Sequence, residues 1–232
     1  PSLNASLDLG ISIFGTRIGS SNDTFSGAEP KRVVKSFIAR SNRLAPQLLQ
    51  LLLQPKRSLP ARRRYQQQHL DLTGNLVDQF ADADVIVHAG DVGNLQVLET
   101  MAGIAPLEAV RGNNDVISKW PKGESNVCSA LPDALVLDLS GGELVVAHGH
   151  QWPRPASRHQ QLRKRWPAAR CIVYGHSHRM VIDQCCEPWV INPGAAGRAR
   201  AYGGAGWLGL TIERRQWRVT PNRFLWTDQA SA

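Results

Sequence analysis

The sequence lacks the features that mark membrane-spanning and secreted proteins. No apolar run approaches the ~20 residues needed to cross a bilayer, and the N-terminus has no basic stretch followed by an apolar one, as a secretion signal would. Only four cysteines occur among 232 residues, without the CxxC spacing of zinc or redox sites. Because a chain of this length buries a core without disulfides, we expect reduced thiols and a cytoplasmic location.

Negative charge is scarce in one part of the chain. Residues 28–70 hold ten Lys or Arg against the single acid Glu29, whereas the remaining residues are almost neutral, so this stretch accounts for the net charge of +8. Aromatic side chains on which nucleic-acid bases stack are almost absent from it. We therefore favour a solvated helical insertion over an arm that binds nucleic acid or anionic lipid.

Apolar spacing divides the chain into three parts. Residues 1–69 combine a short apolar strand at 9–14 with the basic helical segment, residues 70–225 form the main domain, and residues 226–232 are a tail. In the main domain, apolar runs and helical spacing alternate, which is typical of an α/β fold. Helices are predicted at 70–80, 94–102 and 157–169, and strands at 83–92, 106–115, 134–139, 143–150, 171–178, 180–184, 188–192, 206–212 and 216–220.

Side chains that can bind metal stand at the ends of four predicted strands. They are Asp91, Asn113, His148, and the pair His176 and His178. In open α/β sheets the loops at the carboxyl ends of the strands assemble the functional site. One carboxylate, one amide oxygen and three imidazoles make a mixed shell suited to Mn, Fe, Zn, Co or Ni. Neighbouring glycines permit the sharp turns that bring such side chains together.

Each candidate ligand alone also has an ordinary structural explanation. A single histidine at a strand end is usually a hydrogen-bonded structural residue. Asp91 alone can cap a helix that begins near Asn94. Asn113 and Asn114 form a common turn pair. Only the four strand ends taken together favour a metal site.

Three other histidines are assigned to the core or to solvent. His88 lies inside a predicted strand, and we expect it to pack in the core. His69 and His159 fall on helices predicted to be exposed, where water solvates them. These three residues are therefore not part of the predicted metal site.

Five short motifs follow one another along the main domain: GDV at 90–92, GNND at 112–115, HGH at 148–150, GHSH at 175–178 and NPGA at 192–195. In these motifs the chain resembles the calcineurin-like metallophosphoesterases, most closely the small bacterial phosphodiesterase-like members. The resemblance covers about residues 82–220 and implies a four-layer α/β/β/α sandwich with a dinuclear metal site, with Mn²⁺ as the expected ion. It implies that Asp91 bridges two ions, that Asn113, His148 and His176 hold one, and that His178 holds the other.

The first motif of that family, DxH after the first strand, does not occur in this sequence. Three stretches are candidates for its place: FGTRIG at 14–19, NDTFSG at 22–27 with Asp23, and DLTGNL at 71–76 with Asp71. None supplies both ligands, so the resemblance implies one well-formed ion site and a second, weak one. An alternative is that residues 1–68 are a frame-shifted replacement of the true first strand.

The resemblance implies hydrolysis of a phosphate ester, most plausibly a diester, by a metal-activated hydroxide. Many family members carry a histidine as proton donor beside the motif-three asparagine, but here that position is Asn114, which is not an acid. Esters with acidic leaving groups are therefore the expected substrates, with Asn114 and His150 as the candidate catalytic residues. The alternative function is a catalytically silent protein-binding scaffold, as in the retromer subunit that resembles this family.

Overall fold

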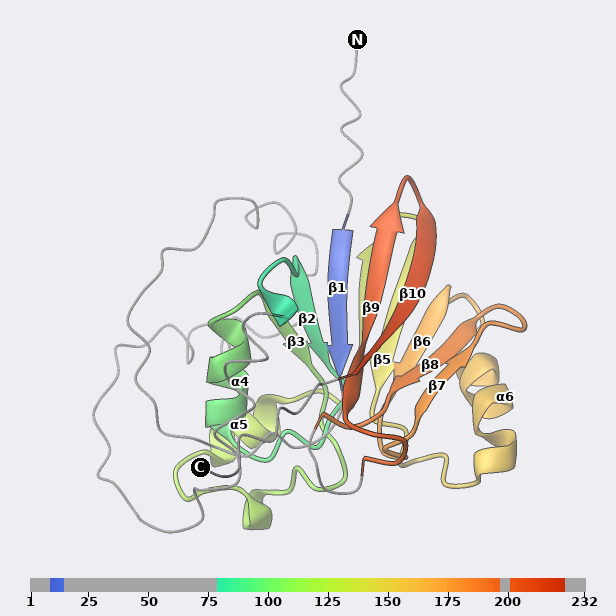
Figure 1. The fold of residues 1–232 in the computed structure, drawn as a ribbon. Helices are drawn as coiled ribbons and strands as arrows, with labels where there is room; N and C mark the ends of the chain where they lie inside the picture. Colours follow the sequence, from blue (N-terminus) through green and yellow to red (C-terminus); the bar gives the residue numbers. More distant parts are fainter. Residues whose placement is uncertain (1–8, 15–78, 197–200, 224–232) are drawn as a thin grey trace, which may run out of the picture.

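The computed structural model describes residues 9–14, 79–196 and 201–223, which form two five-stranded sheets with helices outside them (Figure 1). The first sheet has the order β10-β9-β1-β2-β3, and the second has the order β4-β5-β6-β8-β7. The strands are β1 (Leu9–Phe14), β2 (Val85–His88), β3 (Leu107–Ala109), β4 (Ala134–Leu139), β5 (Gly142–Ala147), β6 (Cys171–Tyr174), β7 (Met180–Asp183), β8 (Trp189–Pro193), β9 (Gly206–Glu213) and β10 (Gln216–Arg223). The helices are α4 (Leu95–Ala102), α5 (Ser125–Ala130), α6 (Pro155–Arg165) and the short 3₁₀ helix η1 (Ile117–Lys119).

Parallel strands lie together within each sheet. In the first sheet β1, β2 and β3 are parallel to one another, and in the second sheet β5, β6 and β8 are. The antiparallel partners are β9 and β10 in the first sheet, and β4 and β7 at the two edges of the second. Each sheet therefore presents several strand carboxyl ends along one edge, the arrangement predicted from the sequence.

Three apolar layers hold the sheets and helices together. The side chains of Val85 and Val87 pack between the two sheets, whereas Ile86, which points to the opposite face of β2, packs with the side chains of α4 and α5. A third cluster, which includes Leu162 of α6 and Ile172 of β6, joins the second sheet to α6. Helices α4 and α5 thus cover one outer face and α6 covers the other, which confirms the predicted four-layer sandwich (Figure 1).

Helix α4 begins where the sequence predicts it. The side chain of Asn94 caps it by accepting a hydrogen bond from the Val97 N–H, at 3.0 Å. The alternative in which Asp91 caps this helix is therefore wrong. Helix α5 and η1 were not predicted, because each is too short to show a helical period in the sequence.

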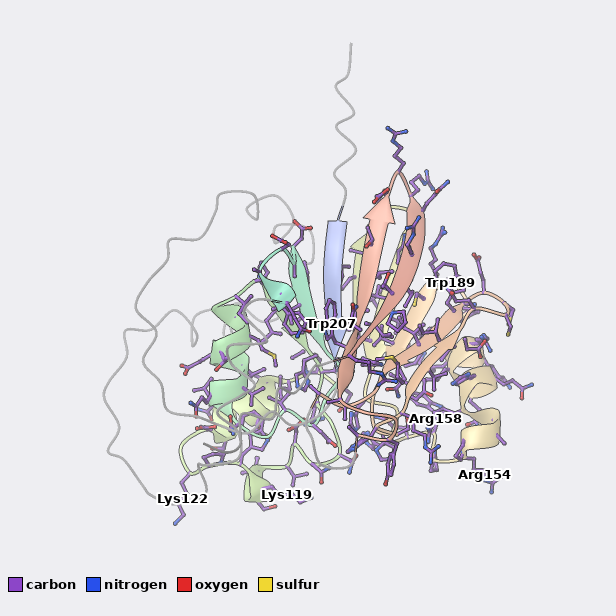
Figure 2. The ribbon with its side chains drawn as sticks, viewed as in Figure 1. Lys119, Lys122, Arg154, Arg158, Trp189 and Trp207 are labelled. Carbon is purple, nitrogen blue, oxygen red and sulfur yellow. The ribbon has the colours of Figure 1, made fainter. Side chains whose placement is uncertain are left out.

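Helix α6 is less exposed than its basic sequence suggests. Arg158 and Leu162 are buried, and Arg158 lies on the side of the helix that faces the second sheet (Figure 2). The Arg158 guanidinium donates hydrogen bonds to the carbonyl oxygens of Trp152 and Pro153, at 2.7 and 3.2 Å, and lies over the ring of Tyr174. Its charge is therefore buried only because its N–H groups have acceptors.

Two predictions about single histidines have opposite outcomes. His88 is fully buried, as expected of a packed core histidine. His159 is not a solvated residue, because it is half-buried and its two ring nitrogens contact Asp183 and the Tyr174 hydroxyl, at 2.5 and 3.0 Å. The helix faces the sheet at this position, which charge-rich sequence alone does not reveal.

The basic stretch 28–70 and the tail 226–232 lie outside the described residues. The first-motif candidates Asp23 and Asp71, which flank the basic stretch in the sequence, lie outside them as well. Of the chain that is described, no helix is long and apolar enough to cross a membrane. None of the four cysteines, all of which lie among the described residues, forms a disulfide.

Candidate functional site

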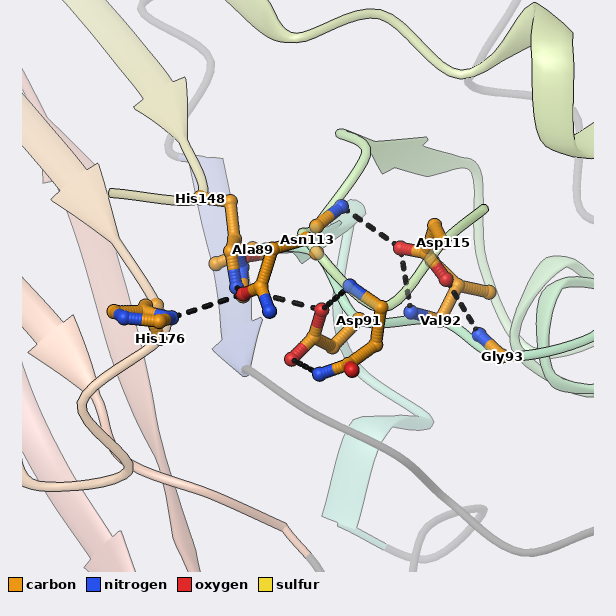
Figure 3. A network of polar contacts seen from close by, with 12 residues as sticks. Ala89, Asp91, Val92, Gly93, Asn113, Asp115, His148 and His176 are labelled. Carbon is orange, nitrogen blue, oxygen red and sulfur yellow. Dashed lines mark hydrogen bonds and ion pairs between the residues drawn. The ribbon is translucent and has the colours of Figure 1, made fainter. Parts of the chain in front are cut away.

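Four of the predicted ligands lie side by side, where the carboxyl ends of strands from both sheets meet (Figure 3). Asp91 and Asn113 follow β2 and β3 of the first sheet, and His148 and His176 follow β5 and β6 of the second. The last paired residues are His88 with Ala109 in the first sheet and Ala147 with Tyr174 in the second, so the loops start at matching levels. The two-sheet packing then brings the two loop pairs together.

The Asn113 side-chain oxygen lies at the middle of this cluster. It is 3.1 Å from His148 Nε2 and 3.0 Å from His176 Nδ1, and His148 Nε2 is 3.4 Å from Asp91 Oδ1. The other nitrogen of the buried His148 ring, Nδ1, is 2.8 Å from the Ala89 carbonyl oxygen. Because that carbonyl only accepts, Nδ1 carries a hydrogen, and Nε2 faces the side-chain oxygens of Asn113 and Asp91.

Side-chain oxygen and nitrogen atoms that converge in this way can hold a cation between them. A histidine that donates one ring N–H to a backbone carbonyl and offers the other nitrogen is the usual form of a metal ligand. One carboxylate, one amide oxygen and two imidazole nitrogens also suit a divalent transition metal. Within the described residues, His, Cys, Asp and Glu side chains form no group of three that could hold an ion. The donor set therefore fits a metal only with the Asn113 amide oxygen included.

The backbone is strained at three of the predicted ligands. Asp91, His176 and His178 have φ values of 59°, 60° and 56°, in the left-handed region that residues other than glycine rarely adopt. Such a conformation costs on the order of 1 kcal/mol or more and persists only where the surrounding structure holds it. The fold therefore holds these backbones in turns that aim their side chains.

Glycines allow the loops to approach one another. A Cβ atom at Gly112 would overlap the backbone nitrogen and Oδ1 of Asp91, and one at Gly90 would overlap the His148 ring. Gly90 also has a φ of 90°. The close contacts of Asp91 and His148 with these loops thus require glycine, as the sequence predicted.

The position of Asp115 was not predicted to have a role, although it ends the GNND motif. Its buried carboxylate accepts four N–H groups: Oδ2 those of Val92 and Gly112, at 3.0 and 2.8 Å, and Oδ1 those of Gly93 and the Trp120 indole, at 2.8 and 3.2 Å. Asp115 thereby ties the loop after β2 to the loop after β3. This link fixes Asp91 relative to Asn113 (Figure 3).

The candidate catalytic residue Asn114 contacts Asp91. Its backbone N–H and its side-chain amide donate to the two oxygens of the Asp91 carboxylate, both at 2.9 Å. Lys119 Nζ donates in turn to Asn114 Oδ1, at 2.8 Å. Burial raises the pKa of Asp91, but hydrogen bonds from His148 and Asn114 outweigh burial and hold that pKa well below its usual range. Asn114 therefore orients an ionised carboxylate.

The other candidate, His150, lines a cavity of about 610 Å³ beside the cluster. Its ring centroid is 5.6 Å from that of His148 and 6.3 Å from that of His176. Burial lowers the pKa of both His150 and His176, and the neighbouring His148 lowers both further. Both shifts favour the neutral form of the imidazole, which is the form that offers a lone pair.

The turn that carries His178 is held by residues of the NPGA motif and of the segment after it. The buried Asn192 donates through Nδ2 to the Gly175 carbonyl and the Ser177 hydroxyl, at 2.6 and 3.1 Å. The Tyr202 N–H donates to the His178 carbonyl, at 3.2 Å. Asn192 therefore positions this turn. The NPGA motif is visible in the sequence, from which no role was predicted for Asn192.

The strand before the first of the three candidate stretches, residues 9–14, is present in the first sheet as β1. The end of β1, Phe14, pairs with His88, so the chain leaves β1 at the edge where Asp91 lies. Residues from 15 onward lie outside the described residues, so the structure does not test Asp23 or Asp71 as replacement ligands.

Comparisons with known proteins agree with the motifs. Residues 68–215 match the model of the calcineurin-like phosphoesterase superfamily domain. The chain is 27% identical over 126 residues to a probable metallophosphoesterase of Methanocaldococcus jannaschii, over 54% of this chain and 59% of that protein. It is 26% identical over 136 residues to a phosphodiesterase of the same organism, over 54% of this chain and 76% of that protein. The match thus spans about three fifths of the first of these relatives.

Solved structures with the same fold include proteins of two kinds. Vacuolar Protein Sorting 29 of Cryptosporidium parvum aligns with a TM-score of 0.53 and 16% identity, over 94% of this chain and 98% of that one. The zinc complex of Vps29 from Entamoeba histolytica aligns with a TM-score of 0.54 and 13% identity, over 93% and 98%. An archaeal phosphodiesterase aligns with a TM-score of 0.50 and 15% identity, over 92% and 99%. At these identities the likeness shows a shared fold.

Proposed function

The chain belongs to the calcineurin-like phosphoesterase superfamily, and on that basis we propose that it is a metal-dependent phosphoesterase that hydrolyses phosphodiesters. The observation that carries this proposal is the convergence of Asp91, Asn113, His148 and His176 from two sheets. Their side-chain nitrogen and oxygen atoms lie 3.0 to 3.4 Å from one another, close enough to share one ion. The proposed substrate is a small-molecule phosphate ester, and no role for nucleic acid is proposed.

Those four residues would hold one divalent ion, for which we propose Mn²⁺. When bound, such an ion supplies a water of lowered pKa and neutralises negative charge on the phosphoryl group. The Ala89 carbonyl fixes the His148 ring so that Nε2 faces the ion position. Asn114 holds both oxygens of Asp91, and Asp115 holds the loops that carry Asp91 and Asn113.

A second ion would be held less well. Asp91 and His178 are the remaining ligands that we propose for it, with a carboxylate such as Asp23 or Asp71 as an untested third. Because the sequence contains no DxH, this second site has fewer protein ligands than the first. We therefore propose one strong and one weak ion site.

The proposed site has few side chains that can donate a proton to the leaving group. Asn114 does not donate a proton as an acid, and it is occupied in orienting Asp91. His150, on the wall between the cluster and the cavity, is the residue that we propose to face the leaving group. Phosphodiesters with acidic leaving groups, such as nitrophenyl esters, depend least on a proton donor and are the proposed best substrates.

The test is an assay of the purified chain with Mn²⁺ on bis(4-nitrophenyl) phosphate, together with measurement of bound metal. His176→Ala should lower kcat/KM by about 100-fold and reduce metal content, because it removes a ligand. His159→Gln is the matched control, since His159 lies on α6 and contacts Asp183 and Tyr174 instead. Unchanged activity in His176→Ala would refute the proposal.

A scaffold that binds other proteins is the second candidate function. The absence of DxH from the sequence favours it, and the fold is shared with Vps29 proteins. Hydrolysis separates the two candidates, because a solved Vps29 structure also contains a metal ion. Hydrolysis with near-stoichiometric Mn²⁺ supports the enzyme, whereas a folded chain without hydrolysis, with or without bound metal, supports the scaffold.

A further inference from the structure

The cavity of about 610 Å³ opens directly beside the proposed ion position. It shares Asn113 and His150 with the site, so a phosphoryl group at the cluster would have its organic substituent at the mouth of this cavity. The cavity is open to solvent on one side, so it would cover one face of a small organic group rather than enclose it. The chemistry of the cavity walls therefore bears on which phosphoesters the site accepts.

One wall is apolar. Val116 and Ile117, both of which line the cavity, are 40% and 59% exposed. They are two of only four large apolar side chains that are exposed in the described part of the chain. Single exposed apolar residues are common on protein surfaces, whereas these two are adjacent and line the same cavity as Asn113 and His150.

The backbone holds these two side chains outward. Asp115, which precedes them, is buried and accepts the Trp120 indole N–H, at 3.2 Å. Trp120, which follows η1, is 5% exposed, so the segment is anchored in the protein at both ends. The Lys119 N–H donates to the Val116 carbonyl, at 2.8 Å, which closes the turn between the anchors. The apolar wall is thus a fixed part of the structure.

The charged groups at the cavity leave no excess positive charge. The Arg111 guanidinium donates through Nε and Nη2 to Asp133 Oδ1, at 3.1 and 2.7 Å, so these two opposite charges offset each other. The Asp115 carboxylate, also in the lining, is occupied by four N–H groups. A second phosphate or another strongly anionic group would therefore find no unpaired cation in the lining.

Resting on the function proposed above, we propose that this cavity binds the uncharged organic group of a phosphoester, a group of aromatic-ring size that packs on Val116 and Ile117. The phosphoryl group then lies at Asn113 and His150, between the ring and the ion position. The substrate class is accordingly an ester of an uncharged aromatic group rather than a polyphosphate or a small alkyl phosphate.

Binding of phosphonates, which are not hydrolysed, tests the cavity apart from catalysis. Phenylphosphonate and methylphosphonate carry the same anionic group and differ in the ring, so calorimetry with Mn²⁺ present measures the effect of the ring. We expect phenylphosphonate to bind about tenfold more tightly, the factor that corresponds to burial of part of a ring. Ile117→Ser should reduce this ratio to about threefold or less and leave methylphosphonate binding unchanged.

Val136→Ser is the matched control, because Val136 is 50% exposed on β4 and does not line the cavity. It should leave the affinities of both phosphonates unchanged. Val116→Ser is a second variant of the apolar wall and should act as Ile117→Ser does. A third probe, 4-carboxyphenylphosphonate, adds a negative charge to the ring and should bind no more tightly than phenylphosphonate.

The outcomes separate this inference from the proposed function. Equal affinities for the two simple phosphonates, or a ratio that neither Ile117→Ser nor Val116→Ser reduces, would refute the aromatic subsite even if the protein hydrolyses nitrophenyl diesters. Tighter binding of the carboxylated probe would show that Arg111 binds anions and would refute the uncharged ligand class. A ring preference without hydrolysis would refute the proposed function and leave the subsite intact.

Discussion

Replacement of Asp115 by asparagine should destabilise the protein strongly, although the two side chains have the same shape. In the wild type each carboxylate oxygen accepts two N–H groups: Oδ2 those of Val92 and Gly112, and Oδ1 those of Gly93 and Trp120. Asparagine keeps one oxygen and puts an NH₂ group in place of the other. Two buried N–H donors then face a third donor.

The expected loss in the free energy of unfolding follows from these hydrogen bonds. Asp115 is 1% exposed, so water does not replace the lost acceptor without rearrangement. Each buried hydrogen bond to a charged acceptor is worth about 1.5–3 kcal/mol, and two of them are lost, so we expect a loss of about 3–6 kcal/mol. This is a large part of the ~5–15 kcal/mol that stabilises a typical domain. Asp115→Ala should cost a similar amount, because it frees all four donors but leaves space for water.

The measurement is the free energy of unfolding in urea at pH 7, with Asp138→Asn as the control. Asp138 is exposed on β4, and its substitution should change stability by less than about 0.5 kcal/mol. A loss below about 1 kcal/mol in Asp115→Asn would contradict the assignment of Asp115 as the link between the two loops.

Two further predictions concern how stability depends on pH. Burial raises the pKa of Glu108 from 4.5 to about 7, and Glu108 Oε2 has no hydrogen-bond partner within the described residues. Between these values the folded state retains a proton that the unfolded state has lost, so wild-type stability falls as pH rises through this window. Glu108→Gln should therefore be more stable than the wild type at pH 8, by about 1–3 kcal/mol, with little difference at pH 4.5; an equal difference at both pH values would contradict this. Burial raises the pKa of Asp183, but hydrogen bonds that include those from Arg163 and His159 hold it well below its usual 3.8. Its stabilisation is present above pH 3.8 and is lost as pH falls toward the folded pKa, so the deficit of Asp183→Asn in thermal unfolding should shrink below pH 3.8; a deficit independent of pH would count against the ionised pair.

Strands and their ends were predictable for a physical reason. The strands β2 and β6 are buried at every position and mostly apolar, because parallel strands at the centre of a sheet are covered on both faces. Polar residues that follow such runs must lie at the carboxyl edge, so Asp91, Asn113, His148 and His176 could be named from sequence. The position of each of these residues directly after an apolar run can be read from the neighbouring sequence alone.

Other features depend on contacts between distant segments. His159 was predicted to be solvated, because a charge-rich helix does not reveal which of its faces meets a sheet. The role of Asp115 was missed, because its acceptor function is visible only when Val92, 23 residues earlier, lies beside it. The apolar wall of Val116 and Ile117 was also missed, because the exposure of these side chains depends on the buried residues Asp115 and Trp120 on either side of them.

The sequence by itself determined where strands follow one another along the chain, which residue types stand at the strand ends, and that no DxH motif is present. These properties follow from local apolar periodicity and residue identity. Only the tertiary structure decided which donor atoms face one another, which carboxylates are held by N–H groups, and where a cavity opens. Those properties arise from packing two sheets together, and short-range sequence pattern carries little information about contacts between residues far apart in the chain.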